Sequence, residues 1–229
     1  MNVGGVEKSF LGLLSMLPPE QYEIHLGLIR KKGGLLDQVP DYVHIHEITV
    51  FDKLWPIIND PPRQTVKRLL KEGHRRQSAI LLALYLVMKL TGSGYWTYRY
   101  LLRNEPFLPD LFDAAYAFAG PSQMIDYYIC KKVHANKKYG WIHFDVSRFG
   151  IDKGLTRRLY RQYEKIYVVS KEAKDVFLCM FPQFASKTEV HYNIVNPDRI
   201  LKFAETAPSF DDGFTGKRIL TVGRISREK

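Results

Sequence analysis

Three short motifs of the chain could act on a phosphorylated or hydroxylated small molecule. The pair Gly4 and Gly5 stands immediately before a helical pattern. Glycines at that place let a ligand approach the free N–H groups and partial positive charge of a helix amino-terminus, although such a pair on its own is more often a simple tight turn. The other two motifs are "WIHFD", which contains His143, and "VGRISREK", which contains Arg224 and Lys229. Two cations that follow an apolar run can attract an anionic group, or can be ordinary surface charges.

His143 is expected at the carboxyl end of a buried strand, which is where parallel sheets bind ligands. A neutral imidazole at that position can donate a hydrogen bond to a sugar hydroxyl and orient it. A histidine after an apolar run also occurs as a purely structural residue, so the motif alone leaves both readings open. Asp145, two residues further on, could accept hydrogen bonds from hydroxyl groups or could cap its own loop.

His25, His44 and His46 alternate on segments that read as strands. No carboxylate or cysteine stands at a spacing that would complete a ligand set, so the sequence predicts no metal site. Cys130 and Cys179 lie far apart and outside any CxxC motif, which predicts buried thiols rather than a disulfide or metal ligands.

The chain of 229 residues has a formal net charge of +10 and a pI of about 9.5. Such a charge attracts nucleic acid, an acidic membrane face or phosphorylated substrates. The basic blocks at 67–76 and 156–163 contain no recognisable nucleic-acid motif, so no nucleic-acid partner is expected. The longest apolar run, at 79–88, is about half the length of a membrane-spanning helix and predicts a buried helix instead.

These residues must be positioned by an alternation of strands and helices, which predicts an α/β fold with a Rossmann-like parallel sheet covered by helices on both faces. The expected strands cover 22–29, 42–48, 113–120, 139–144, 165–170, 188–194 and 218–223, and the segment at 113–120 suits a central strand. The expected helices cover 6–17, 63–72, 78–90, 122–133, 153–163, 171–181 with Ser170 as its N-cap, and a stretch that begins at Pro197.

A doubly wound domain normally starts with a strand that leads into its glycine turn, and here the glycine turn comes first. The sequence therefore predicts a Rossmann-like domain over 1–206 that lacks its first strand. A polar, turn-rich linker is expected at 207–217, followed at 218–229 by the first strand and turn of an incomplete second domain.

The motifs in their order resemble retaining glycosyltransferases of family 4, which have the GT-B architecture. The resemblance rests on "GGVEKSFLGLLSMLPPEQYEIHLGLIRKKGGLL", "WIHFD", "YVVSKEAKDVF", "NIVNPDRI" and "LTVGRISREK", and it is least specific over 49–104. It implies that Gly4 and Gly5 line the cleft between two domains and that His143 is a catalytic residue that contacts the donor sugar. It also implies that Arg224 and Lys229 hold the donor's diphosphate.

The same resemblance implies a nucleotide-sugar substrate, most simply a UDP-sugar, with no further cofactor. The acceptor would be a saccharide or a lipid-linked hydroxyl compound, in polysaccharide or glycolipid synthesis in a bacterial cytoplasm or at the inner face of its plasma membrane. The paired-glutamate motif of the family's second domain is absent from the sequence, so we expect this chain alone to lack transferase activity.

Two alternatives remain at this point. The chain could belong to another GT-B enzyme, such as a nucleotide-sugar epimerase or a glycerophosphotransferase. It could also be a non-enzymatic basic module that binds nucleic acid or an anionic membrane. The basic helices expected within 63–90 fit a membrane-surface face, and they fit an ordinary amphipathic helix as well.

Overall fold

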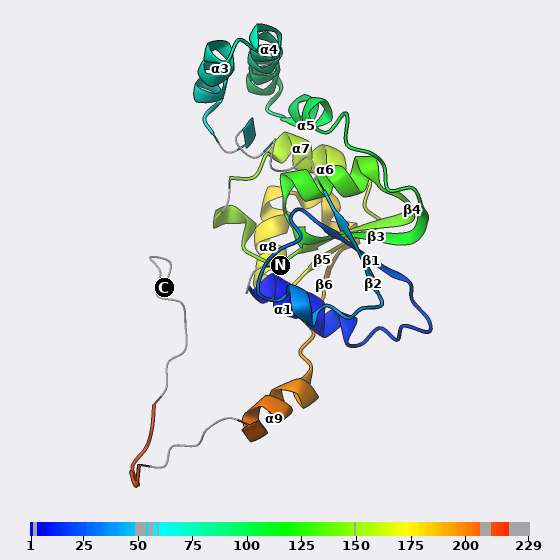
Figure 1. The fold of residues 1–229 in the computed structure, drawn as a ribbon, viewed down its shortest axis with the longest axis vertical. Coiled ribbons are helices and arrows are strands. Elements are labelled where there is room, and N and C mark those ends of the chain that lie inside the picture. Colours follow the sequence, from blue (N-terminus) through cyan, green and yellow to red (C-terminus); the bar gives the residue numbers. More distant parts are fainter. Residues whose placement is uncertain are drawn as a thin grey trace. The chain divides into compact units, whose positions relative to one another are not determined.

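A computed structural model describes residues 1, 4–48, 54, 57–58, 60–148, 150–206 and 212–219. The chain divides into two compact units, Met1–Val195 and Asn196–Lys229. The first unit has the predicted α/β class, because a parallel four-stranded sheet is flanked by helices in a Rossmann-like arrangement (Figure 1).

The described strands form two separate parallel sheets. The smaller sheet pairs β1 (Ile24–Leu28) with β2 (Val43–Glu47), and the larger has the order β3 (Leu111–Gly120), β4 (His134–Ile142), β5 (Lys165–Val168) and β6 (Thr188–Val190). The helices of the first unit for which the described residues give bounds are α1 (Gly5–Leu14), α3 (Pro62–Lys71), α4 (Arg75–Thr91), α5 (Tyr95–Leu101), α6 (Gln123–Lys132), α7 (Lys153–Tyr160) and α8 (Lys171–Met180). Short 3-10 helices cover Leu36–Gln38, Val146–Arg148 and Pro182–Lys187.

Local sequence signals set several helix ends. Ser170 caps α8 as predicted, because its hydroxyl accepts a hydrogen bond of 3.1 Å from the Ala173 N–H. Asp152 caps α7 in the same way. Gly92 ends α4 with a φ of 63°, a left-handed conformation that favours glycine.

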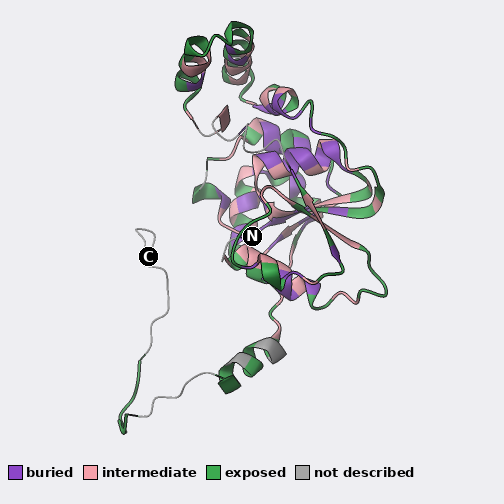
Figure 2. Ribbon diagram, viewed as in Figure 1, coloured by how far each residue is buried: buried purple, intermediate pink, exposed green. Residues whose placement is uncertain are grey.

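The two faces of the larger sheet carry different side chains. One face presents small and aliphatic residues to α6, α7 and α8, and this layer forms the main core (Figure 2). The other face carries an aromatic row, namely Tyr116, Phe118, Tyr139, Trp141 and Tyr167. Helix α1 reaches this second face, since the rings of Phe10 and Phe118 lie 5.4 Å apart in an edge contact. Helices therefore reach both faces of the sheet.

A second, smaller core lies between α1 and the β1–β2 pair. Leu11 and Leu14 of α1 pack with Val43 and with the alternate apolar residues Ile24 and Leu26. Because side chains on a strand alternate between faces, the residues between these apolar positions point away from α1. Those residues include the three histidines of the two strands.

Helix α4 differs from the prediction of a buried helix. Only Ser78 and Leu81 of this helix are buried, while Leu82 and Leu86 are exposed and Leu90 is 87% exposed. The reason is its position, since α4 packs against its neighbours α3 and α5 at the border of the unit rather than between sheet and helix layers. The apolar run thus has one buried stripe instead of burial on all sides.

Other predictions also need correction. The strand that ends at Gly120 was expected in the middle of the sheet, but β3 lies at one edge of the described four-stranded sheet. The last strand of this sheet, β6, ends at Val190 rather than at 194. Helix α5 was not predicted, because aromatic residues dominate it and the strand propensity of that composition hides its helical period. Cys130 is buried as expected, whereas Cys179 is exposed, and both thiols are free.

The second unit contains α9 (Pro197–Thr206), which begins at the predicted proline. Residues 212–219 form neither helix nor strand. Most of the predicted strand at 218–223 lies outside the described residues, and the predicted domain limits stay a prediction. No helix within the described part of the chain is long and apolar enough to cross a membrane.

Candidate functional site

His143 follows β4 directly, and its backbone N–H donates a hydrogen bond of 3.2 Å to the carbonyl of Gly120, the last residue of β3. Its predicted position at the carboxyl end of a parallel strand is therefore confirmed. Its role in binding a sugar remains a prediction.

The imidazole of His143 is held among aromatic rings, with centroids 4.6 Å from Phe118 and 5.8 Å from Trp141. Burial lowers the pKa of His143 to about 4, against a smaller opposing effect of the Phe118 carbonyl and the Asn193 side chain. The ring is thus neutral at pH 7. Within the described residues neither of its buried nitrogens makes a well-formed hydrogen bond, and the same holds for Nε1 of Trp141. Buried polar atoms in this condition call for a partner such as a ligand or water.

A pocket of about 240 Å³ opens beside His143. It lies where β4 and β5 end and α8 begins, the position at which doubly wound sheets bind ligands. Its lining residues are His143, Phe144, Asp145, Val169, Ser170, Glu172, Ala173 and Val176. The lining combines apolar residues with Ser170 and with the two carboxylate residues Asp145 and Glu172, which suits a molecule that offers hydroxyl donors.

Asp145 caps its own loop. Its Oδ1 accepts hydrogen bonds from the Ser147 N–H at 2.9 Å and the Ser147 hydroxyl at 2.6 Å, and its Oδ2 lies 3.3 Å from Nε of Arg148. These contacts, led by the Ser147 hydroxyl, lower the pKa of Asp145. Of the two roles that the sequence allowed, capping is the one visible in the structure.

Gly4 is the N-cap of α1 and Gly5 is its first residue. A Cβ at Gly4 would lie 2.5 Å from Oε2 of Glu7, whereas a Cβ at Gly5 would meet nothing within 4 Å. Gly4 therefore allows the carboxylate of Glu7 to fold over the helix start, where negative charge is favourable. An anionic ligand at this helix start would have to displace the Glu7 carboxylate or bind beside it.

Helix α1 is joined to the neighbourhood of His143 through the segment after β6. The hydroxyl of Ser9 donates a 2.8 Å hydrogen bond to Oδ1 of Asn193. The next residue, Ile194, approaches so closely that a Cβ on Gly12 would clash with its backbone carbonyl oxygen. The structure thus connects the glycine-led helix with His143 by way of Ser9 and Asn193. Arg224 and Lys229 lie outside the described residues.

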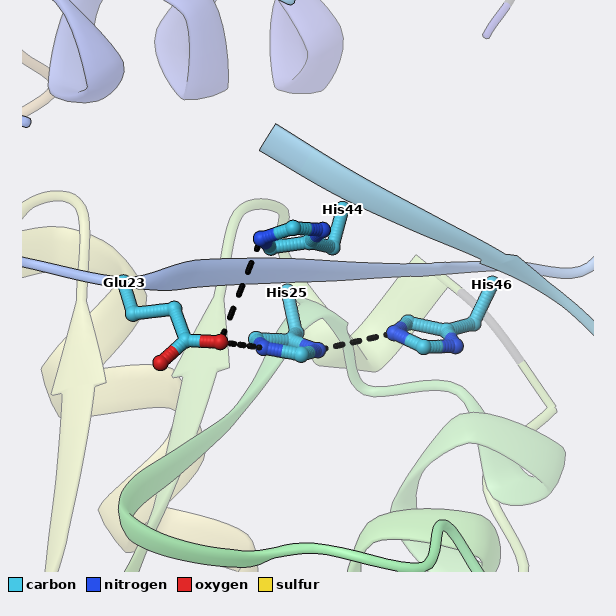
Figure 3. A network of polar contacts seen from close by, with 4 residues as sticks. All are labelled: Glu23, His25, His44 and His46. Atoms are coloured by element: carbon cyan, nitrogen blue, oxygen red, sulfur yellow. Dashed lines mark hydrogen bonds and ion pairs between the residues drawn. The ribbon is translucent and has the colours of Figure 1, made fainter. Parts of the chain in front are cut away.

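A second group of polar side chains corrects the sequence reasoning on metal ligands. Glu23, two residues before His25, places Oε1 3.0 Å from Nε2 of His25 and 3.9 Å from Nε2 of His44 (Figure 3). On its other side, Nδ1 of His25 lies 2.8 Å from Nε2 of His46. The sequence reasoning did not recognise Glu23 as a carboxylate partner of these histidines. The signal was present as Glu-x-His and His-x-His, which put alternate side chains on one face of neighbouring strands.

Comparison of the sequence with models of known protein families finds no match, and comparison with curated proteins finds no significant similarity.

Proposed function

We propose that this chain is the acceptor-side part of a retaining GT-B glycosyltransferase that moves a sugar from a UDP-sugar to a hydroxyl group of a saccharide or lipid-linked acceptor. The observation that carries the proposal is His143, a neutral imidazole with unsatisfied buried nitrogens at the carboxyl edge of a Rossmann-like sheet. The order of the motifs along the sequence supports it. The pocket beside His143, with its hydroxyl and carboxylates, supports a sugar-like occupant.

A neutral histidine can donate a hydrogen bond from one ring nitrogen and accept one at the other, so it can fix the orientation of a sugar with two hydroxyl contacts. Glu172 at the start of α8 offers carboxylate oxygens to further hydroxyl groups. In the proposed reaction the bond between the anomeric carbon and the diphosphate oxygen breaks while the acceptor oxygen bonds to the same face of that carbon. The departing phosphate oxygen takes the acceptor's proton, so no carboxylate nucleophile of the kind used by retaining glycosidases is required.

Arg224 and Lys229 complete the proposal by stabilising the negative charge that develops on the leaving diphosphate. The proposed roles of Arg224 and Lys229 rest on the sequence motif alone. The aromatic packing of His143 holds its ring in one place, which is the requirement for a residue that positions a substrate.

The test is an NMR titration of the ring nitrogens of the histidines with UDP-sugars and with free mono- and disaccharides. We expect the signals of His143 to shift saturably with at least one of these compounds, and His143→Ala to weaken binding of that compound as read from the backbone amide signals of neighbouring residues. His134→Ala is the matched control, because His134 is exposed and begins the same strand that His143 follows. Unchanged His143 signals at about 10 mM of every compound would reject the proposal.

A second candidate function, peripheral contact with an anionic membrane, is favoured by the surface of α3 and α4. A groove of about 430 Å³ on α3 is lined by Lys67, Arg68 and Lys71 together with Gln64 and Glu72. The exposed leucines at 82, 86 and 90 repeat every four residues and so form one stripe on α4. Cations beside an exposed apolar stripe are typical of helices that lie in a membrane interface.

Co-sedimentation with vesicles tests this second function. The chain should bind vesicles that contain about a third anionic phospholipid and should lose binding in Leu86→Glu or Lys67→Glu. Binding that is equal on purely zwitterionic vesicles, or absent on both kinds, would argue against it.

A further inference from the structure

The cluster of Glu23, His25, His44 and His46 is built by two neighbouring strands. In the register of β1 and β2, His25 stands opposite His44, and Gly27 stands opposite His46. Glu23 comes two residues before His25 and so projects from the same face. The apolar residues between these positions point to α1, which leaves the polar side chains together on the opposite face.

The distances between the polar atoms match those of a metal ligand set. One atom from each of Glu23, His25 and His44 can be chosen so that all lie within 4.8 Å of one another. In a tetrahedral zinc site with bonds of about 2.0–2.1 Å the ligand atoms lie about 3.3 Å apart. The two separations from Oε1 of Glu23, 3.0 Å to His25 and 3.9 Å to His44, stand on either side of that value.

The surroundings of His25 provide the outer support that metal-binding histidines usually have. With Nε2 facing Glu23, its Nδ1 can carry the proton and donate to Nε2 of His46 at 2.8 Å. Such a bond fixes the tautomer and the ring orientation. The rings of His25 and His46 are nearly coplanar, with centroids 5.0 Å apart, and the His25 ring makes an edge contact with Phe112 at 5.0 Å. The side chain of His25 is only 14% exposed, whereas those of Glu23 and His44 are open to solvent at 75% and 59%.

We propose that Glu23, His25 and His44 bind one divalent transition-metal ion, with Zn²⁺ the best match to two imidazoles and a carboxylate, and with His46 as the hydrogen-bonding support of His25. Three protein ligands leave a fourth tetrahedral position for water. Nickel(II) is a second suitable ion, because imidazole ligands accept it as well.

The proposed metal site is separate from the sugar site. His25 and His44 are the second residues of their strands, and His25 touches Phe112, the second residue of β3. The cluster therefore lies at the amino ends of the strands, whereas His143 lies beyond the carboxyl end of β4. A metal there would tie β1 to β2 rather than take part in chemistry at His143, and the inference does not depend on the proposed glycosyl transfer.

The experiment is isothermal titration of the metal-free chain with ZnCl₂, repeated with NiCl₂. We expect one ion per chain, and a loss of affinity of tenfold or more in His44→Ala and in Glu23→Gln. His46→Ala should weaken binding by about 10- to 100-fold, as expected for a supporting residue. Because Glu23 and His44 are exposed, their variants should fold, and circular dichroism checks that they do.

Two controls separate this site from other metal-binding groups. His134→Ala removes an exposed histidine outside the cluster, and Cys179→Ser removes the exposed thiol. Both should bind zinc as the unaltered chain does. The proposal is overturned if neither ion binds saturably up to about 1 mM. In that case hydrogen bonds through His25, and no metal ion, would join Glu23 to His46. It is also overturned if His44→Ala and Glu23→Gln bind as tightly as the unaltered chain.

Discussion

His143 beyond β4 and His25 in β1 are both largely enclosed and both in contact with an aromatic ring, yet the partners of their nitrogens differ. The nitrogens of His143 lack well-formed hydrogen bonds within the described residues, and a pocket opens beside the ring. Both nitrogens of His25 face polar atoms of neighbouring side chains. The carboxyl edge of the larger sheet therefore has an unpaired imidazole and a pocket, whereas the amino edge of the β1–β2 sheet has polar side chains that already contact one another.

The comparison teaches that the two kinds of site need different sequence signals. The position of a histidine at the end of a strand, such as His143, can be predicted from a single motif. A cluster across two strands can be found only when the register of the strands is known. If the two edges are independent, a change at one of them should leave the other unaltered.

The largest effect is expected from zinc. If the ion binds the folded chain alone, a free concentration of 100 times the dissociation constant raises the free energy of unfolding by about 2.7 kcal/mol. Thermal unfolding should show an upward shift in the unaltered chain and in His143→Gln. Glu23→Gln should show little or no shift under the same conditions, and an equal shift in that variant would contradict a site at the amino edge.

Gly12→Ala should disturb the carboxyl edge and leave the amino edge intact. Its Cβ would clash with the carbonyl oxygen of Ile194, so we expect a loss of about 1–3 kcal/mol in the free energy of unfolding and altered NMR signals of His143. Urea unfolding measures the first effect.

Gly5→Ala is the matched control in the same helix, because no atom lies within 4 Å of its Cβ. It should change the free energy of unfolding by less than about 0.5 kcal/mol. Zinc affinity should be the same in both variants, and a coupled loss of zinc binding in Gly12→Ala would show that the two edges are not independent.

Tyr163→Phe tests the buried support of the carboxyl edge. The Tyr163 hydroxyl donates a 2.7 Å hydrogen bond to Oδ1 of Asp126, whose Oδ2 accepts a bond of 3.1 Å from the N–H of Ser122 just after β3. Burial raises the pKa of Asp126 to about 7, against the hydrogen bonds from Tyr163, Ser122 and Tyr160. Removing the hydroxyl should cost about 1–2 kcal/mol in urea unfolding. Tyr160→Phe, which loses a longer contact of 3.4 Å to the same carboxyl group, should cost less.

The last expected effect is a dependence of stability on pH. The pKa of His143 is about 4 in the folded chain, against 6.5 for an unperturbed histidine, so the unfolded chain binds more protons between these values. The contribution of His143 is therefore present above about pH 6.5 and is lost as the pH falls towards 4. Between pH 7 and pH 5 the free energy of unfolding should fall more in the unaltered chain than in His143→Gln. Equal slopes would show that the ring is not held neutral.

Periodicity alone was sufficient to predict most of the fold. The helices that begin at Lys153 and Lys171 start where predicted, because polar caps and apolar spacing agree at those places. The exposure of Leu86 could not be predicted in this way. The hydrophobic pattern of an apolar helix is the same whether the helix packs against neighbours on all sides or on one side. The edge position of β3 also depends on pairing with distant segments, which local patterns do not contain.

The candidate site was predictable only where its residues belong to one local motif. His143 could be placed because strand, histidine and turn are contiguous in the sequence. Glu23 could not be recognised as a partner of His44, since only the parallel register of β1 and β2 brings the two together. The roles of Arg224 and Lys229 rest on their motif, because they lie outside the described residues.

The contact between Ser9 and Asn193 joins positions that are 184 residues apart. A ribosome that adds about 5–20 residues per second needs roughly 10–40 s to make that stretch of chain. During this interval the nascent α1 can already pack on β1 and β2, but the side that carries Ser9 has no partner from β6 onward. The emerging polypeptide therefore presents a half-finished surface of α1 for many seconds.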